Sequence, residues 1–422
     1  MKRRDALKTI GGTVAGLAVG GRFIDSSAKY AHAEEKPEFH KEILPSPGGK
    51  RVAIIGGGFS GVSFANTLRE LATESEIVIL EKNPFFVSGP SHIDYSVGMK
   101  KLEDAARSYY HLREKGIKVI KTDVAAILPG ENKVMTSKGN LTYDYLLMAT
   151  GIRLADEEIL QLSENPAYNA HAWELEGTIE LRKRVENFKG GNVIVSVPSA
   201  PFKCPPGPYE MACLLNEFFK KKDINADVLV VDSNDKPQPP PLAQKWLTVF
   251  EKKGIKYMPN NKVVEIDGAN KQLITDKGDK IKYDLVTLIP PNKASTIIKE
   301  AGLGDPFVDV DPTTFKSKKF ENVFATGDCA KVPYTKSAYT SMYQGKNAAY
   351  YTAISMGYSV KEPAPIHNIC YPYTSSIDSM LIRVDWEKDG KVAKTTADDP
   401  KSDYRDSRAV WESTLLKSLF GY

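Results

Sequence analysis

The chain has 422 residues, of which 41% are apolar and 26% charged, a balance typical of a globular protein with two or three domains. The formal net charge is +4, and residues 1–33 alone account for it, because they contain six basic and two acidic side chains. The rest of the chain is near neutral, so a nucleic-acid partner has no electrostatic support. No run of about 18 apolar residues follows the N-terminus, so we expect no transmembrane segment.

Residues 1–33 have the pattern of an export signal. Arg3 and Arg4 form a twin-arginine pair, the glycine-rich apolar stretch Thr9–Gly21 follows, and Ala31–Ala33 supplies small residues for cleavage. Twin-arginine export carries folded proteins, so it suits a protein that takes up a bulky cofactor before crossing a membrane. We therefore predict a periplasmic protein; the alternative is a basic N-terminus without a targeting role.

An alternation of strands and helices begins after this segment. The pattern predicts a strand at Arg51–Gly56, a helix at Ser60–Ala72 and a strand at Glu76–Leu80, which together form a βαβ unit. Further strands are expected at Lys118–Thr122 and Tyr145–Ala149.

A glycine-rich loop lies between the first strand and the first helix. Gly56, Gly58 and Gly61 form G-x-G-x-x-G with Ser60 inside the motif, and Glu81 ends the next strand. Glycines let the backbone approach a pyrophosphate, the helix N-terminus offers free N–H groups, and the carboxylate accepts from ribose hydroxyls. The sequence therefore predicts dinucleotide binding; the alternative is a glycine-rich turn of another α/β fold.

Two later segments favour FAD over NAD. The segment Leu146–Gly151, in which a strand runs into a turn at Thr150 and Gly151, resembles the segment that returns the chain to the cofactor in two-domain flavoproteins. The segment Asn322–Asp328 resembles their second flavin motif, in which Gly327 and Asp328 are placed for the ribityl or pyrophosphate region. Each segment alone would fit an ordinary strand end, whereas their order and separation indicate FAD.

A long helix is predicted over Ser337–Met356. Its N-terminus, placed under an isoalloxazine ring, would stabilise the negative charge that forms on flavin reduction. Lys336 would add to this effect; the alternative is a solvated lysine at the start of a helix.

The second α/β half opens differently. A strand at Asn192–Val197, a helix at Tyr209–Lys221 and a strand at Asp227–Val231 repeat the βαβ pattern. Prolines that have no N–H for a phosphate replace the expected glycine loop and surround Cys204. A rigid backbone around one cysteine fits a fixed redox sulfur, and a buried inert thiol is the alternative. The α/β alternation continues over Leu242–Lys253, Ile255–Met258, Lys262–Ile266 and Leu285–Ile289.

The chain has four cysteines, Cys204, Cys213, Cys329 and Cys370. None belongs to a C-x-x-C or C-x-x-C-H motif, so we predict no zinc or iron–sulfur site and no c-type haem on this chain. Three full disulfide pairings are possible, and spacing does not choose between them. Cys213 is expected in a helix core, and the role of Cys329 is left open.

The chain resembles the flavoprotein subunit of flavocytochrome c sulfide dehydrogenase, within the wider group of sulfide:quinone oxidoreductases. The likeness extends over nearly all of the chain after the signal. It is sharpest at Cys204–Glu210, Thr326–Asp328, Lys336–Lys346 and Asn368–Tyr371. The resemblance implies a redox-active disulfide between the cysteines at 204 and 370, beside the flavin.

The resemblance also implies a reaction, the oxidation of hydrosulfide to sulfur or polysulfide, with electrons passed to a c-type cytochrome supplied by another chain. Glu210, six residues after Cys204, is the candidate general base; the alternative is a first-turn glutamate that complements the helix dipole. Family members often tether FAD through a cysteine near Phe85–Ser91, but no cysteine occurs there, so FAD is expected to bind without a covalent link.

These inferences together predict an α/β fold, with two Rossmann-like domains of the disulfide-reductase flavoprotein type and a small C-terminal α+β domain. The FAD-binding domain is expected over 34–165 and 290–360. Residues 166–289 would form the second domain, without a nucleotide loop, and 361–422 a domain at the flavin side or an interface.

Three other interpretations stay open. A sulfide:quinone oxidoreductase would have an amphipathic C-terminus, and Val410–Leu419, within a helix predicted at Ser407–Phe420 after a hairpin of Ser379–Trp386 and Lys391–Thr395, has some of that spacing. A non-catalytic sulfur-binding relative would lack flavin. An NAD(P)H-dependent disulfide reductase is disfavoured by the missing second glycine loop.

Overall fold

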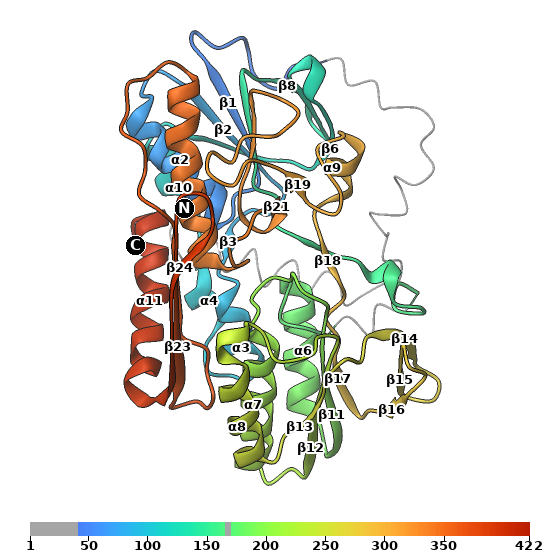
Figure 1. The fold of residues 1–422 in the computed structure, drawn as a ribbon. Coiled ribbons are helices and arrows are strands. Elements are labelled where there is room, and N and C mark those ends of the chain that lie inside the picture. The colour runs from blue at the N-terminus through green and yellow to red at the C-terminus, as the bar shows by residue number, and fades with distance from the viewer. Residues whose placement is uncertain (1–40, 165–169) are drawn as a thin grey trace.

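A computed structural model describes residues 41–164 and 170–422 (Figure 1). The predicted export signal lies outside the described residues. Among the described residues, no helix has both the length and the apolarity needed to cross a bilayer.

The first α/β half is built on a five-stranded parallel sheet in the order β20-β9-β1-β2-β5. All five residues of β1 are buried, as expected of a parallel strand with both faces covered. The helices α2 and α10 lie side by side on this sheet (Figure 1). The bounds are β1 Arg51–Ile55, α2 Phe59–Leu71, β2 Glu76–Glu81, β5 Lys118–Lys121, β9 Tyr145–Met148, β20 Val323–Ala325 and α10 Ala338–Ser355.

Smaller elements complete this half. Three of its strands, β6, β7 and β8, form a small antiparallel sheet. The two-residue strands form the pairs β3-β4, β10-β18 and β19-β21. The bounds are β3 Phe86–Val87, α3 Pro90–Ser96, α4 Leu102–Ala105, β4 Ala106–Arg107, α5 Tyr110–Glu114, β6 Val124–Leu128, η1 Pro129–Glu131, β7 Lys133–Thr136, β8 Gly139–Thr142, β10 Arg153–Leu154, η2 Asp156–Glu158, β18 Asn292–Lys293, α9 Thr296–Glu300, β19 Val308–Asp309, η5 Gly327–Cys329 and β21 Ala330–Lys331.

The second half has a four-stranded parallel sheet in the order β13-β12-β11-β17 and a small antiparallel sheet, β14-β15-β16. It forms the lower part of the molecule in Figure 1, with α6, α7 and α8 packed on its sheet. The bounds are α6 Leu175–Asn187, β11 Gly191–Val197, α7 Gly207–Lys221, β12 Ala226–Asp232, η4 Pro240–Leu242, α8 Ala243–Lys253, β13 Lys256–Met258, β14 Val263–Asp267, β15 Gln272–Thr275, β16 Lys280–Lys282 and β17 Leu285–Thr287.

The C-terminal part is an antiparallel sheet, β22-β23-β24, with the long helix α11 packed on it. Helix α11 also contacts α2 of the first half, and β24 contacts η4 of the second, so this part bridges the two (Figure 1). The bounds are β22 His367–Cys370, β23 Ser379–Trp386, β24 Val392–Lys401 and α11 Ser402–Phe420.

The predicted α/β fold class, with its smaller C-terminal α+β part, is confirmed. Three local features differ from the sequence-based expectation. Strand β24 runs to Lys401 and α11 begins at Ser402, because an exposed edge strand tolerates the charged residues and proline that precede the helix. Helix α6 was not predicted, since only a narrow stripe that includes Leu181 and Val185 is buried along it.

Candidate active site

A deep cleft lies where the two α/β halves and α11 meet. Its cavity volume is about 280 Å³. Its walls include most of the predicted site residues, namely Gly58, Ser60, Glu81, Gly151, Cys204, Glu210, Gly327, Asp328 and Cys370. The structure thus brings together residues that are more than 300 positions apart in the chain.

The glycine-rich loop forms one wall because its backbone turns tightly between β1 and α2. Gly56 has φ +106°, and a Cβ there would lie 2.3 Å from the carbonyl oxygen of Ala149. A Cβ on Gly61 would lie 2.0 Å from the carbonyl oxygen of Gly56, so glycine is needed for α2 to start this close to the strand. A Cβ on Gly58, in contrast, would meet no atom of the described chain within 4 Å, which leaves its backbone open to a ligand.

Glu81 ends β2 beside this loop and is mostly buried. Its Oε2 accepts from the backbone N–H of Gly57 at 2.6 Å, and its Oε1 accepts from the backbone and side-chain nitrogens of Asn83. The carboxylate is therefore held at the cleft wall, at the position from which an acid accepts from ribose hydroxyls.

Asp328 supplies a buried acceptor elsewhere on the cleft wall. Its Oδ1 is buried without a hydrogen-bond partner among the described residues, and burial raises the pKa of this carboxyl group. A buried polar atom with no partner is costly, and a hydroxyl of a bound ligand would satisfy it. The neighbouring Gly327 N–H donates to Gln344 Oε1 at 2.8 Å, and the Thr326 hydroxyl is hydrogen-bonded to that of Ser60.

The N-terminus of α10 faces the same cleft. Ser337 caps the helix by accepting from the Thr340 N–H, and Ser337 and Ala338 line the cleft wall. This helix N-terminus, the open Gly58 backbone and the unpartnered Asp328 oxygen together fit a flavin dinucleotide. Gly151 borders the cleft with φ +67°, and Thr150 precedes it in the segment after β9, which ends at Met148.

Lys336 is buried and lines a second, smaller pocket behind the Cys204 loop. Its ammonium donates to the carbonyl oxygens of Asp328 and Ala330 at 2.7 and 3.0 Å, and it lies over the Phe307 ring. Lys336 thus holds the segment that carries Asp328, while its proposed action on the flavin stays a prediction.

The loop that carries Cys204 is fixed on both sides. The Cys204 N–H donates to the Lys336 carbonyl at 2.8 Å, and the Cys204 carbonyl accepts from the Gly207 N–H at 2.9 Å. Cys204 has φ +56°, a left-handed conformation that costs a non-glycine residue about 1 kcal/mol or more. Lys203 and Trp173 exchange two hydrogen bonds of 2.9 Å, which joins this loop to the start of α6.

Cys370 ends β22 and reaches the same cleft as Cys204. All four cysteines are free thiols in the described chain, so the disulfide stays a prediction. Burial raises the pKa of Cys204 to about 12. Burial, and to a lesser extent the nearby Cys204 sulfur, also raises the pKa of Cys370. In this state both side chains are protonated and weakly nucleophilic at neutral pH.

Glu210 lies in the first turn of α7 and is almost completely buried. Burial raises its pKa to about 7, although the nearby Arg408 guanidinium acts in the opposite direction. Glu210 Oε1 lies 3.0 Å from Arg408 Nη1. A carboxyl group poised near neutral pH at the cleft wall can take up and release a proton there.

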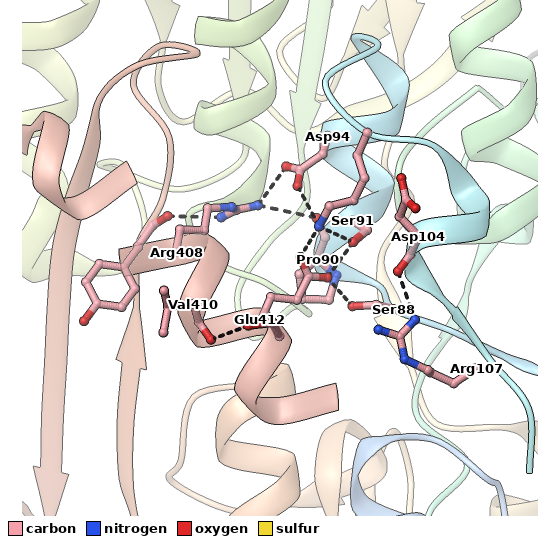
Figure 2. A network of polar contacts seen from close by, with 12 residues as sticks. Ser88, Pro90, Ser91, Asp94, Asp104, Arg107, Arg408, Val410 and Glu412 are labelled. Atoms are coloured by element: carbon pink, nitrogen blue, oxygen red, sulfur yellow. Dashed lines mark hydrogen bonds and ion pairs between the residues drawn. The ribbon is translucent and has the colours of Figure 1, made fainter. Parts of the chain in front are cut away.

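A buried polar network links α11 to α3 (Figure 2). Arg408 pairs with Asp94 at 3.2 Å, and Asp94 pairs with Lys100 at 3.5 Å. Lys100 also pairs with Glu412, which accepts from the hydroxyls of Ser88 and Ser91. Burial alone would raise the pKa of Glu412, but Lys100 and these hydrogen bonds bring it below its usual value.

Two buried histidines also lie near the cleft. His92 lines it, and neither of its ring nitrogens has a hydrogen-bond partner in the part of the chain that the structure describes. Burial and the nearby Lys203 lower the pKa of His92 to about 3 and that of His171 to about 4, so both rings are neutral at physiological pH.

Sequence reasoning missed Arg408, His92 and Trp173, which line the cleft, and Asp94, which pairs with Arg408. None of them belongs to a motif, and a single arginine in a C-terminal helix is usually exposed. The resemblance had marked Cys204 and Cys370, but nothing local indicated which charged groups would face them. Cys213 is a core residue of α7, as expected, and Cys329 is buried with its thiol toward the Met148 and Thr326 carbonyls.

The fold and the cleft define a class, the two-domain flavoprotein oxidoreductases with a dinucleotide loop in one half and a cysteine loop in the other. A family model described as pyridine nucleotide-disulphide oxidoreductase matches residues 13–195. A second model, described as the central part of the sulfide dehydrogenase (flavocytochrome c) flavoprotein chain, matches residues 178–290.

Curated relatives narrow the class. The mitochondrial sulfide:quinone oxidoreductase of Dictyostelium discoideum is 30% identical over 306 residues, covering 68% of this chain and 67% of its own. The mouse (Mus musculus) enzyme of the same name is 25% identical over 301 residues, with the same coverage. The sulfide:quinone oxidoreductase structure from Aquifex aeolicus superimposes with a TM-score of 0.78 at 20% identity, covering 88% of this chain and 92% of that one.

The chain therefore belongs to the sulfide-oxidising flavoprotein family that includes sulfide:quinone oxidoreductases and the flavocytochrome c sulfide dehydrogenase flavoprotein chain. It is an FAD-dependent oxidoreductase of that family.

Proposed function

We propose that the protein oxidises hydrosulfide through a disulfide between Cys204 and Cys370 and passes the electrons to a c-type cytochrome. The observation that carries this proposal is the meeting of the two cysteines in one cleft with Asp328 and the glycine-rich loop. In the oxidised protein the two sulfurs would be bonded, and hydrosulfide would be the nucleophile.

The first step is a thiol–disulfide exchange. The hydrosulfide sulfur bonds to one Sγ, the Sγ–Sγ bond breaks, and its electron pair remains on the other cysteine as a thiolate. A persulfide is left on the first cysteine, beside the thiolate of the second. Loss of two electrons and one proton from this pair bonds the outer persulfide sulfur to the second cysteine, and a further hydrosulfide that attacks in the same way lengthens the chain to polysulfide at the cost of two more electrons. FAD, when bound, supplies a two-electron acceptor beside these sulfurs.

Glu210 is the proposed general base of this step. Its pKa near 7 lets it accept the proton of hydrogen sulfide or of the persulfide at neutral pH. The alternative role, a charge that only complements the N-terminus of α7, is weakened by the burial of the carboxyl group at the cleft wall.

We propose that FAD is held without a covalent bond. Phe85, Val87, Gly89 and Pro90 line the cleft, so this segment reaches the cofactor site, yet it offers no thiol. Gly58, Glu81, Asp328 and the N-terminus of α10 would hold the dinucleotide. Denaturation with acid should release all the flavin into the supernatant, and flavin that stays with the polypeptide would contradict the proposal.

The electron acceptor separates two candidate functions. The match of residues 178–290 to the flavocytochrome c flavoprotein chain favours a cytochrome, whereas the names of the Dictyostelium and mouse relatives favour a quinone. We infer a cytochrome as the primary acceptor. Anaerobically sulfide-reduced protein should transfer electrons faster to cytochrome c than to a soluble quinone, and the reverse order would favour the quinone function.

We also propose export to the periplasm by the twin-arginine route, on the evidence of Arg3 and Arg4 followed by a short apolar stretch. A fusion of residues 1–40 to a reporter should be exported, and replacement of both arginines by lysine should stop it. Export of the lysine variant by the same route would contradict the proposal.

The function is tested by adding sulfide to the anaerobic holoprotein and following flavin absorbance. Sulfide should bleach the flavin, and the bleaching should disappear when either Cys204 or Cys370 is replaced by serine. Bleaching at an unchanged rate in either variant would refute the disulfide route. Purified protein without flavin would instead favour the non-catalytic relative.

A further inference from the structure

A buried arginine, Arg408, lines the cleft together with the two cysteines. Arg408 projects from α11 and lines the same cleft as Cys204, Cys370 and Glu210, with only 4% of its side chain exposed. Its position depends on α11, a helix far from both cysteine loops in the sequence (Figure 1).

The guanidinium is held from several directions. Its Nη1 donates to the carbonyl of Tyr371, the residue after Cys370, at 3.1 Å, and its Nη2 lies 3.2 Å from Asp94 Oδ1. Nη2 also donates to the Pro90 carbonyl (Figure 2). The guanidinium lies over the Tyr373 ring, 4.1 Å from its centroid. These contacts fix the charge beside the segment that carries Cys370.

The charge of Arg408 acts strongly because it is buried and an arginine stays protonated. The two carboxyl groups that face it are Glu210 and Asp94, and burial raises the pKa of each above its usual value. Burial also disfavours thiolates at Cys204 and Cys370 by raising their pKa values. Of the groups that lower these pKa values, the Arg408 guanidinium has the largest effect at both sulfurs. A neighbouring cation is thus available to an anion in the cleft.

We propose that Arg408 selects anionic sulfur species and stabilises the thiolate that forms when the Cys204–Cys370 bond is broken, with Asp94 as the residue that positions its guanidinium. This inference rests on the proposed function and assigns a residue to it that no motif indicated. Hydrosulfide enters with one negative charge, and after the exchange one negative charge remains on the released cysteine. The same fixed cation balances both, so the step needs no movement of charge in the protein.

A purely structural role for Arg408 would give a different result. An arginine that only fastens α11 to α3 would, when replaced, lower the free energy of unfolding without changing how the cysteines distinguish charged from neutral reagents. The measurement must therefore report charge at the sulfurs and not overall stability.

The test uses the full-length holoprotein, reduced at its cysteines and alkylated in parallel with neutral iodoacetamide and anionic iodoacetate. Peptide mapping gives the rate at Cys204 and Cys370 separately. The ratio of the two rates cancels the thiolate fraction and most effects of access. The variants are Arg408→Gln, the charge-retaining Arg408→Lys and Asp94→Asn, with Arg405→Gln as the matched control on an exposed position of the same helix.

We expect the iodoacetate-to-iodoacetamide ratio at Cys204 and Cys370 to fall at least about fivefold in Arg408→Gln, the scale of one unit charge a few ångströms away. Arg408→Lys should restore most of the ratio, Asp94→Asn should give an intermediate value, and Arg405→Gln should match the wild type. The absolute iodoacetamide rate at pH 9 should also fall in Arg408→Gln by about threefold or more, since a higher thiol pKa lowers the thiolate fraction more than it raises nucleophilicity.

An unchanged ratio in Arg408→Gln would overturn the inference. If that variant does not fold, Asp94→Asn decides, and a wild-type ratio in Asp94→Asn would overturn the inference equally. The experiment involves no sulfide turnover, so its outcome is independent of the proposed function. That function fails separately if sulfide does not bleach the wild-type flavin.

Discussion

In each α/β half, a loop that we call the corner joins the first strand to the helix that follows it. The two corners occupy equivalent places in the fold but carry different chemistry. In the first half β1 runs into Gly56 and the open backbone of Gly58, and in the second β11 runs into the proline-rich loop of Cys204. Each corner feeds a helix whose first turn borders the common cleft, with Ser60 in α2 and Glu210 in α7. One corner offers backbone N–H groups to a phosphate, and the other fixes a sulfur.

The strand that follows each corner shows the same divergence. Glu81 ends β2 and faces the cleft, whereas Asp232 ends β12 and is fully buried. The hydroxyls of Tyr209 and Tyr257 donate to Asp232 at 2.7 and 2.9 Å. Two tyrosines thus take the acceptor that a ribose would need, so the second half has kept the Rossmann framework and replaced its nucleotide contacts with core packing.

The sharpest way to break this comparison is to remove the sulfur from the second corner. Cys204→Ser and Cys370→Ser should lower the rate of sulfide-dependent flavin reduction by about a thousandfold or more, because the covalent route is lost. FAD content should be unchanged, since the first corner binds it. Cys213→Ala, in the core of α7, is the control and should keep the wild-type rate to within about threefold.

Glu210 tests what the helix after the second corner contributes. Burial raises its pKa to about 7, so its basic form, and with it kcat, should decrease as the pH falls through 7. Glu210→Gln should lower kcat by roughly 10²- to 10⁴-fold and remove this acidic limb from the pH profile. A variant that keeps both the rate and the limb would assign the titration to another group.

Glu81 and Asp232 end equivalent strands of the two halves, so replacing each of them tests the comparison directly. Glu81→Ala should weaken FAD binding by roughly 10- to 100-fold, the scale of losing a hydrogen bond to a charged group, as measured by flavin titration of the apoprotein. Asp232→Ala should leave FAD affinity unchanged. It should instead lower the free energy of unfolding by about 2 kcal/mol or more, because the buried hydroxyl of Tyr209 and the partly buried hydroxyl of Tyr257 lose their acceptor. Equal effects of the two substitutions on FAD affinity would refute the assignment.

The smallest expected effect is that of a nicotinamide cofactor. The hydroxyls of Tyr209 and Tyr257 donate to the Asp232 carboxylate, and prolines replace the phosphate-binding loop around Cys204. NADH or NADPH should therefore leave the flavin oxidised over minutes under anaerobic conditions. Rapid bleaching by either nucleotide, in a protein that sulfide also bleaches, would show that the second half still binds one.

The sequence predicted the parts of this site that depend on local pattern. Gly56, Gly61 and Glu81 follow from a motif whose spacing is set by one βαβ unit, and the structure places them as that spacing requires. Cys204 followed from prolines in place of a glycine loop. Its pairing with Cys370 came only from resemblance, because the two lie on elements whose meeting no local pattern encodes.

The charged groups around the sulfurs could not be predicted in this way. Arg408 meets Glu210 and Asp94 only because the C-terminal part packs against both α/β halves. In sequence, Arg408 is one basic residue in a helix with many charges. The structure also revealed α6, whose thin apolar stripe was too weak a signal against its polar residues.

The most direct test of the account is a non-reducing peptide map of the holoprotein before and after one equivalent of sulfide, without oxygen. We predict a cross-linked peptide joining Cys204 and Cys370 before sulfide. Afterwards one extra sulfur should be bound at these cysteines. Where the flavin is bleached, the extra sulfur should bridge the two cysteines as a trisulfide, in proportion to the bleaching, and where the flavin stays oxidised it should be a persulfide beside a free thiol. Two uncoupled free thiols before sulfide, with bleaching that proceeds all the same, would contradict the central claim.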